Sequence, residues 1–380
     1  MRPTQTEPIA IVGAGAAGLA CAWVLSREGF AVTVVDEGLP TQNALWASGG
    51  MLAAGFECAF ELDAKHALRA EFAALAARAL ELWPDWVARL EAEASMAVDF
   101  ERCGSVTPIL SAEESARAAQ AATRARDLGF NPERWTEADL TAAEPSLAGH
   151  LGGLHFPDDA QLDNRKLAAA LIAACQSQGV QFEVGRKATG LDFRAGQARG
   201  VILEGESIVS AAQIILATGA STLTGAVTPP AMTSVKGQMV AFAAARPLAP
   251  NRIVRSLSIY LAAKSGNRLI AGATSEVGCH DTNTDEAALK ALTQAARALV
   301  PGLVAVPVTE QWAGLRPRSS DAMPILGELA SGVIFAGGGY RNGVLLAPMI
   351  AEAVRSALVT GDWPEIARPF GPNRASLASV

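Results

Sequence analysis

A glycine-rich turn near the start of the chain limits the possible folds more than any other feature of the sequence. The residues from Gly13 to Gly18 read Gly-Ala-Gly-Ala-Ala-Gly, with an apolar run at 8–12 before them and a helix-forming run at 15–28 after them. In such a pattern the first glycine allows a sharp turn, the second, Gly15, lets the backbone approach a pyrophosphate, and the third lets helix and strand pack closely. The free N–H groups of the helix start would face the phosphates. The pattern predicts a strand–turn–helix unit that binds a dinucleotide.

A second strand is predicted over 31–36, which is rich in β-branched residues and ends in Asp36. A carboxylate at this point accepts hydrogen bonds from ribose hydroxyls, and it disfavours NADP because it would repel the 2′-phosphate. The glycine motif by itself does not separate NAD from FAD. An NAD-dependent dehydrogenase, a non-catalytic nucleotide-binding module and an ordinary glycine turn therefore stay open as alternatives at this point.

The first strand and helix overlap an apolar run, residues 9–25, that a signal peptide or a short membrane span would also explain. Three glycines lie inside this run, and Glu7 and Pro8 stand immediately before it. No other run reaches 18 apolar residues without a charge or a breaker. We therefore expect a buried strand, turn and helix here, and no membrane span.

The composition of the chain excludes several classes of function. Its 380 residues suit two domains, and the formal net charge of -7, with no basic block, argues against a nucleic-acid surface. The five cysteines contain no Cys-x-x-Cys pair, so a reducing, cytoplasmic location is the expectation. The four histidines have no metal-binding spacing, so no metal site is predicted. The oligomeric state is left open.

Beyond residue 60 the sequence alternates between helical and strand-like patterns, and we expect the chain to cross between the domains several times. The expected helices are 62–94, in one or two pieces broken near Trp83 and Pro84, then 111–128, 163–178, 285–299 and 344–358. The expected strands of the second half are 235–243, 253–263, 268–274, a stretch around 308–312, and 333–336.

A second strand–glycine–helix junction lies about 320 residues after the first. The stretch from Gly337 to Gly343 reads Gly-Gly-Gly-Tyr-Arg-Asn-Gly and stands between the predicted strand 333–336 and the helix 344–358. Its helix start could face the isoalloxazine ring of FAD and stabilise the reduced, anionic flavin. A loop that merely needs glycines is the plain alternative.

Arg316 stands in a mostly apolar run between Trp312 and Arg318. A buried arginine needs a partner, and a carboxylate matches its planar fork. The partner could be a substrate carboxylate or an internal Asp or Glu. The only two tyrosines of the chain, Tyr260 and Tyr340, fall in segments assigned to the same site, although a core position would explain each of them.

Three segments carry a resemblance to a known family: RLIAGAT at 268–274, WAGLRPRSSDAMPILG at 312–327 and GGYRNGVLLAP at 338–348. Together with the N-terminal glycines they resemble the FAD-dependent D-amino-acid oxidase superfamily, and within it the glycine oxidases of thiamine biosynthesis. The resemblance implies an α/β (α+β) fold, with a Rossmann-type FAD-binding domain and a substrate domain built on a large antiparallel sheet. The implied domain division gives residues 1–85, 150–225 and 320–380 to the FAD domain, and 86–149 with 226–319 to the substrate domain.

The resemblance also implies the residues that bind FAD. Those near the pyrophosphate, the ribose, the adenine and the flavin are Gly13, Gly15, Ala16, Ala17, Gly18, Asp36, Glu37, Ala44, Leu45, Gly49, Gly50, Met51, Ala188, Gly339, Tyr340, Arg341, Asn342, Gly343, Val344 and Leu345. The flavin-side turn contains no Cys or His, so the FAD is expected to be bound non-covalently.

For the substrate, the resemblance implies that Arg316 and Tyr260 hold the amino-acid carboxylate and that Arg341 lies beside flavin and substrate. The implied reaction is oxidative deamination of glycine or a related small amino acid to the oxo acid, with oxygen reduced to hydrogen peroxide. A dehydrogenase or oxidase of a D-amino acid or of a bulkier N-substituted amino acid is the alternative. Gly339 and Ser275 depart from residues common in the family, and both lie near the expected substrate pocket.

Overall fold

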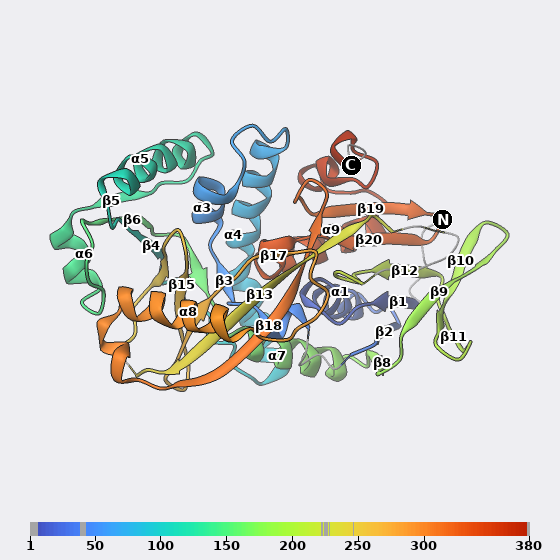
Figure 1. Ribbon diagram of the computed structural model, residues 1–380. Coiled ribbons are helices and arrows are strands. Elements are labelled where there is room, and N and C mark those ends of the chain that lie inside the picture. The colour runs from blue at the N-terminus through green and yellow to red at the C-terminus, as the bar shows by residue number, and fades with distance from the viewer. Residues whose placement is uncertain are drawn as a thin grey trace.

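The protein is built on two large sheets that lie beside each other and share helices at their junction (Figure 1). The computed structural model describes residues 7–38, 43–221, 223, 227, 229–245 and 247–377.

The first sheet has six strands in the order β19-β20-β12-β1-β2-β8, and all of its neighbours are parallel except β19 and β20. Ile9 and Ile11 of β1 belong to one buried cluster, and Ala10 and Val12 belong to another on the opposite face. Burial on both faces explains why these strands read as continuous apolar runs. The strands are β1 (Ile9–Val12), β2 (Val32–Asp36), β8 (Gln181–Val184), β12 (Gln213–Leu216), β19 (Ile325–Ala330) and β20 (Val333–Gly337).

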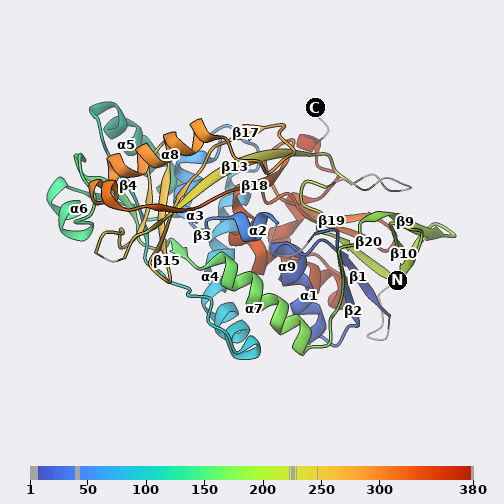
Figure 2. The same cartoon turned by 60° about the horizontal axis from the view of Figure 1, so that its bottom comes forward.

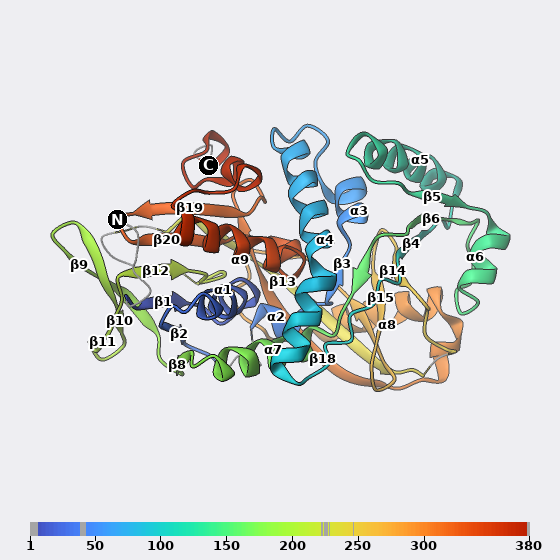
Figure 3. The ribbon, with the colours of Figure 1, turned by 180° about the vertical axis from the view of Figure 1, so that it is seen from behind.

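Helices cover one face of this sheet, and a small antiparallel sheet covers the other. In the view from behind, α1, α7 and α9 lie across the first sheet and α4 crosses towards the second (Figure 3). The same helices also lie side by side in the rotated view of Figure 2. These helices are α1 (Ala16–Arg27), α4 (Arg69–Ala94), α7 (Asn164–Ser177) and α9 (Gly343–Thr360), and the small sheet consists of β9 (Ala188–Arg194), β10 (Gln197–Leu203) and β11 (Ile208–Ser210).

The second sheet has nine strands, and its neighbours are antiparallel except for β14 and β4. Helix α8 (Glu286–Leu299) buries its apolar side against one face, while α5 (Ala112–Asp127) and α6 (Glu137–Ala143) lie near the far end (Figure 1). The strands are β4 (Ser105–Pro108), β5 (Glu133–Trp135), β6 (Gly153–Phe156), β13 (Met232–Ala243), β14 (Ile253–Arg255), β15 (Tyr260–Lys264), β16 (Arg268–Gly272), β17 (Glu276–Val277) and β18 (Val308–Ser319).

Short elements connect these layers. They are α2 (Ala44–Ala47), β3 (Met51–Leu52), α3 (Ala54–Phe56), the π-helical η1 (Glu57–Glu61), β7 (Ala160–Gln161), and the 3-10 turns η2 (Pro301–Ala305), η3 (Tyr340–Asn342), η4 (Glu365–Phe370) and η5 (Ala375–Leu377).

The sequence predicts a helix break near Trp83 and Pro84, and that prediction is wrong. Helix α4 runs through Pro84 without interruption. Trp83 and Trp86 are fully buried and make edge-on ring contact with each other at 5.1 Å, and Trp83 donates to the carbonyl of Leu345 at 2.9 Å. Anchoring of both tryptophans in the core offsets the hydrogen bond that proline removes from the helix.

Two strand predictions in the second sheet are also corrected. The stretch 253–263 forms two antiparallel strands, β14 and β15, because Ser256 to Ile259 make a tight turn in which the Ser256 hydroxyl accepts from the backbone N–H of Ile259. The stretch at 308–312 continues to Ser319, because β18 pairs with β13 over its whole length. This extension places Arg316 on a strand.

The predicted division into two domains stays a prediction. Within 150–225, which it gives to the FAD domain, β6 pairs with β4 and β5 of the nine-stranded sheet. Helix α4 spans the predicted boundary at residue 85 and packs on α7 and α9.

The apolar start of the chain is a buried strand, turn and helix, as predicted. By length and composition the stretch Tyr340–Thr360 could cross a membrane, a test that the core helix of a soluble protein also passes. In the structure 61% of its most apolar window is buried. Its packing on α1 and α4 accounts for its apolar composition.

Candidate active site

A cavity of about 470 Å³ lies at the junction of the two sheets, and both glycine-rich turns open onto it. It gathers residues that are far apart in the sequence, from the first turn, from η1, from five strands of the nine-stranded sheet (β13, β14, β15, β16 and β18) and from the turn before α9. The predicted residues that line it are Gly15, Ala16, Ala17, Ala44, Leu45, Gly49, Gly50, Met51, Tyr260, Arg316, Gly339, Tyr340, Arg341, Asn342, Gly343 and Val344.

The N-terminal glycine turn leaves the start of α1 open to this cavity. Gly15 is the N-cap and brings no capping side chain, and no atom of the described residues lies within 4 Å of the place where its Cβ would stand. Gly13 has a φ of +113°, and a Cβ at Gly18 would collide with the carbonyl oxygen of Gly13. The open space over Gly15 and the uncapped N–H groups fit a bound pyrophosphate.

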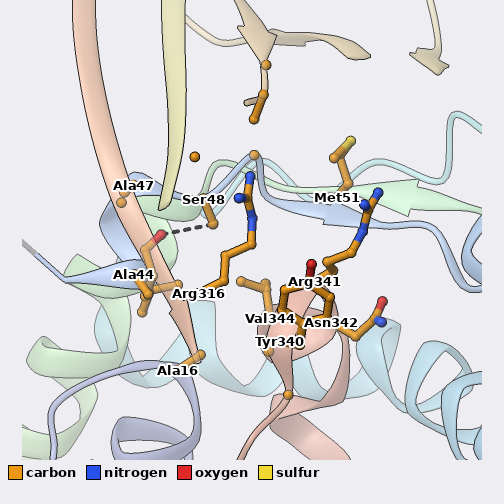
Figure 4. Close-up of a pocket in the computed structure, with 18 of the residues that line it drawn as sticks. Ala16, Ala44, Ala47, Ser48, Met51, Arg316, Tyr340, Arg341, Asn342 and Val344 are labelled. Atoms are coloured by element: carbon orange, nitrogen blue, oxygen red, sulfur yellow. Dashed lines mark hydrogen bonds between the residues drawn. The ribbon is translucent and has the colours of Figure 1, made fainter. Parts of the chain in front are cut away.

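The second glycine turn presents another helix start to the same cavity. Asn342, the N-cap of α9, makes no side-chain capping hydrogen bond within the described chain, and Gly343 has nothing within 4 Å of its Cβ position. Tyr340 has a φ of +46° and lies in the cavity wall between Arg316 and Arg341 (Figure 4). Two helix starts on one cavity fit a cofactor that carries phosphates at one end and a ring that becomes anionic at the other.

Six of the predicted cofactor residues do not line the cavity. Gly13 and Gly18 belong to the glycine turn but do not face the cavity. Leu345 is buried in the core, and Ala188 begins β9 outside the cavity. Asp36 accepts from the backbone N–H groups of Ala14, at 2.6 Å, and of Gly38, at 2.8 Å. Glu37 pairs with Lys187 and accepts from Ser221. Their roles towards the adenosine part of FAD stay predictions.

Glycines leave space in the cavity wall that the nine-stranded sheet forms. Gly237 on β13 lies opposite Gly314 on β18, and Tyr260 on β15 lies opposite Gly272 on β16. A methyl group at Gly272 would lie 2.8 Å from the Tyr260 hydroxyl, and one at Gly49 would lie 3.0 Å from it. The absence of side chains at these positions makes room for the two polar groups that the sequence assigns to substrate.

Arg316 brings a positive charge to the cavity wall. Its guanidinium donates to the backbone carbonyl of Thr274 at 3.3 Å, and no carboxylate in the described part of the chain forms an ion pair with it. Burial lowers the pKa of Arg316 below its ordinary value, although an arginine stays protonated. A partly buried charge without a partner is costly, and a carboxylate from outside the protein would satisfy it.

Tyr260 is held as a hydrogen-bond donor beside that cation. Burial raises the pKa of its hydroxyl, so the group stays protonated. The hydroxyl lies 3.2 Å from the sulfur of Met239, which is a weak acceptor. A carboxylate oxygen would be a much better partner.

Arg341, which the resemblance places with the substrate, is paired within the protein. Its Nε lies 3.3 Å from Glu57, and its Nη2 lies 3.0 Å from Glu61. Glu57 also pairs with Arg255 at 2.8 Å. Burial alone would raise the pKa of Glu57, but Arg341 and Arg255 together lower it, so the carboxylate is ionised.

Sequence reasoning missed Glu57 and Arg255. A charged residue inside an apolar segment was the available signal, the same signal that singled out Arg316. It also missed Asn43, whose side chain caps α2 and donates to the carbonyl of Ala14 at 2.8 Å. Among the described lining residues the titratable groups are Glu57, Glu61, Arg255, Tyr260, Arg316, Tyr340 and Arg341.

A cavity reached by two helix starts, on a doubly covered parallel sheet, suits a long cofactor with a pyrophosphate. The fold and the cavity together define the class of the protein as a dinucleotide-dependent oxidoreductase.

The comparisons with known proteins narrow that class. The family model for FAD dependent oxidoreductases matches residues 8–357, and the chain belongs to this family. Its cofactor is FAD. The sequence prediction of the D-amino-acid oxidase superfamily and of FAD is thereby confirmed.

Individual relatives agree with this placement. The bifunctional protein ThiO/ThiG of Trichormus variabilis is 34% identical over 362 residues, which are 93% of this chain and 53% of that protein. The chain thus spans about half the length of that relative. A glycine oxidase of Geobacillus kaustophilus is 28% identical over 98% of both chains, and its crystal structure superposes with a TM-score of 0.87 over 97% of this chain and 99% of that one. Hydrogen cyanide synthase subunit HcnC of Pseudomonas aeruginosa is 29% identical over 98% of this chain and 99% of its own.

Proposed function

We propose that the protein oxidises the carbon–nitrogen bond of a small amino acid, glycine or an N-substituted glycine such as sarcosine, with FAD as cofactor. The observation that carries the proposal is the partly buried guanidinium of Arg316 beside the Tyr260 hydroxyl, for which the described residues supply no carboxylate partner. A carboxylate is the anion that satisfies both groups at once. The glycine oxidase relatives support the choice of a small amino acid.

In this proposal the two side chains supply binding and orientation. Arg316 takes the carboxylate through its planar fork, and Tyr260 donates one further hydrogen bond. FAD, when bound, supplies the acceptor for the two electrons and the hydrogen lost from the substrate carbon. No histidine, lysine or cysteine lies among the described lining residues, and both glutamates are engaged by arginines. The amine must therefore enter in its neutral form, rather than lose a proton to a base in the site.

The overall reaction with oxygen consumes amino acid, oxygen and water, and yields oxo acid, ammonia and hydrogen peroxide. A secondary amine gives the smaller amine in place of ammonia. The competing proposal keeps the site and passes the electrons to another acceptor, which would make the protein a dehydrogenase. Peroxide release separates the two.

A role in thiamine biosynthesis belongs to the same proposal and is supported by the likeness to ThiO/ThiG. Cytoplasmic location and homo-oligomer formation remain proposals as well.

The test is anaerobic reduction of the FAD-loaded protein by the amine, which is measured as the loss of flavin absorbance. Glycine, sarcosine and N-ethylglycine should bleach the flavin, and Arg316→Ala should lose most of that response at the same amine concentrations. Tyr260→Phe removes one charge-assisted hydrogen bond and should lower kcat/KM by about tenfold. If no amine bleaches the wild-type flavin, the proposed substrate class is wrong.

A further inference from the structure

Arg341 and Arg316 point the same way from the floor of the cavity, on either side of the Tyr340 ring (Figure 4). Two guanidinium groups in one cavity could bind two carboxylates of one substrate. Whether both are available depends on the anions that already surround them.

The two arginines differ in this respect. Arg341 lies against the π-helical turn η1, where Glu57 is 3.3 Å from its Nε and Glu61 is 3.0 Å from its Nη2. Glu57 is buried, with 7% of its side chain exposed, and is also fixed by Arg255. The carboxylates of Glu57 and Glu61 balance the charges of Arg255 and Arg341. Arg316 is the one cation left without a counter-ion among the described lining residues.

We infer that this pairing makes the site selective for amines with a single carboxylate, and that Glu61 is the residue that excludes a second one. The inference rests on the proposed function and specifies its substrate class. Glu57 and Glu61 already occupy Nε and Nη2 of Arg341, so a second carboxylate bound at this guanidinium would lie against both of these carboxylates. Like charges brought together away from water repel strongly, so this arrangement acts against dicarboxylates.

Glu61 is the member of the cluster that can be altered without disturbing the core. Its side chain is 36% exposed, and Arg341 is the ion-pair partner found for it in the described chain. Glu57, in contrast, holds two arginines and is buried, so its removal would leave a buried positive charge unpaired. Glu61→Gln therefore frees Nη2 of Arg341 while Glu57 keeps the arginine in place.

Three amines with the same reacting glycine unit test the inference. Sarcosine carries a methyl group on nitrogen, N-ethylglycine a neutral two-carbon group, and iminodiacetate a group that ends in a second carboxylate. The wild-type protein should oxidise the first two and use iminodiacetate at least tenfold less well by kcat/KM. Glu61→Gln should raise kcat/KM for iminodiacetate about tenfold relative to N-ethylglycine, the effect of one charge-assisted hydrogen bond gained.

Two further variants separate a specific effect from a general change of charge. The double variant Glu61→Gln with Arg341→Gln should lose the gain, because the gain passes through Arg341. Glu81→Gln removes an equal charge from an exposed pair with Arg78 on α4 and should leave the ratio unchanged. A wild-type protein that oxidises iminodiacetate as well as N-ethylglycine would overturn the inference, as would a gain that persists without Arg341.

A failure of the proposed function gives a different result. In that case none of the three amines bleaches the flavin in any variant. Binding of iminodiacetate, followed calorimetrically on the FAD-loaded protein, then tests the inference by itself: tighter binding to Glu61→Gln than to wild type supports it, and equal binding overturns it.

Discussion

The guanidinium group of Arg316 lies over Gly237 of the neighbouring strand, in the space that a methyl group at Gly237 would occupy. Arg316 pairs in register with Val235 of β13, which stands two residues before Gly237 on the same strand. The long side chain of Arg316 therefore reaches along β13 to Gly237. Gly314, opposite Gly237, leaves the same part of the wall open. The position of the one cation that lacks a counter-ion among the described lining residues thus depends on a residue that has no side chain.

Gly237→Ala should therefore displace Arg316 without removing it. We expect KM for the amino acid to rise by about tenfold or more, because a misplaced fork loses its charge-assisted hydrogen bonds. The measurement is amine-dependent flavin reduction over a concentration range. Gly371→Ala is the control, since the added methyl would make only an ordinary contact at 3.5 Å. An unchanged KM in Gly237→Ala would mean that Arg316 does not hold the carboxylate.

Gly15→Ala should separate cofactor binding from folding. Within the part of the chain that the structure describes, no atom lies within 4 Å of the added methyl, and the φ of Gly15 is -82°, which alanine tolerates. We expect the stability of the FAD-free protein to change by less than about 0.5 kcal/mol. FAD affinity should fall, because the methyl occupies the space intended for the pyrophosphate. Gly18→Ala should instead lower the stability of the FAD-free protein, because its methyl meets the carbonyl of Gly13. Wild-type FAD affinity in Gly15→Ala would place the phosphates elsewhere.

Asp159 should make folding stability depend on pH near neutrality. Its carboxylate is buried and accepts from the Ser105 hydroxyl at 2.6 Å and the Gly55 N–H at 2.9 Å, and burial raises its pKa to about 7. Between an unfolded pKa of about 4 and that value, the folded state keeps a proton that the unfolded state has lost. Stability should then fall as pH rises through this window, by at most about 1.4 kcal/mol per pH unit.

Urea unfolding between pH 4 and pH 8 measures this slope. Asp159→Asn cannot ionise, still has an acceptor for Gly55, and should flatten the slope within the window. Ser105→Ala removes a hydrogen bond that lowers the pKa of Asp159, so it should extend the falling slope to higher pH. The same slope in wild type and Asp159→Asn would exclude Asp159 as its source.

Asp321 should have the opposite pH dependence. Arg374 pairs with it through both Nε, at 2.7 Å, and Nη2, at 2.8 Å, and the pair is almost fully buried. Burial would raise the pKa of Asp321, but Arg374 and Ser376 hold it well below its ordinary range. The stabilisation is therefore present above the unfolded pKa of about 4 and is lost as pH falls below it.

Asp321→Asn should lower the free energy of unfolding by about 3 kcal/mol at pH 7, because it leaves the buried Arg374 without its counter-ion. The loss should shrink in acid. Asp158→Asn is the control, because its pair with Arg102 is exposed and such pairs contribute about 1 kcal/mol or less. Equal effects of the two substitutions at pH 7 would contradict the importance of burial for this pair.

The local features of the fold were predictable from the sequence. Strand β1, the turn from Gly13 to Gly18, helix α1 and strand β2 follow from hydrophobic pattern and glycine placement over about thirty residues. The turn before α9 was readable for the same reason. The unbroken α4 was not, since Pro84 argues locally for a break and only the burial of Trp83 and Trp86 against distant segments keeps the helix intact.

By itself the sequence determined the two glycine turns, the FAD cofactor through family likeness, and Arg316 as a charged residue in an apolar run. These predictions depend on short-range patterns, because each pattern consists of residues that are close together in the sequence. Only the tertiary structure decided that Arg341 pairs with internal carboxylates while Arg316 meets none among the described residues. Arg341 and Glu57 stand 284 residues apart in the chain. Their pairing depends on how η1 is brought against the start of α9, and no local pattern encodes which of two arginines meets an internal carboxylate.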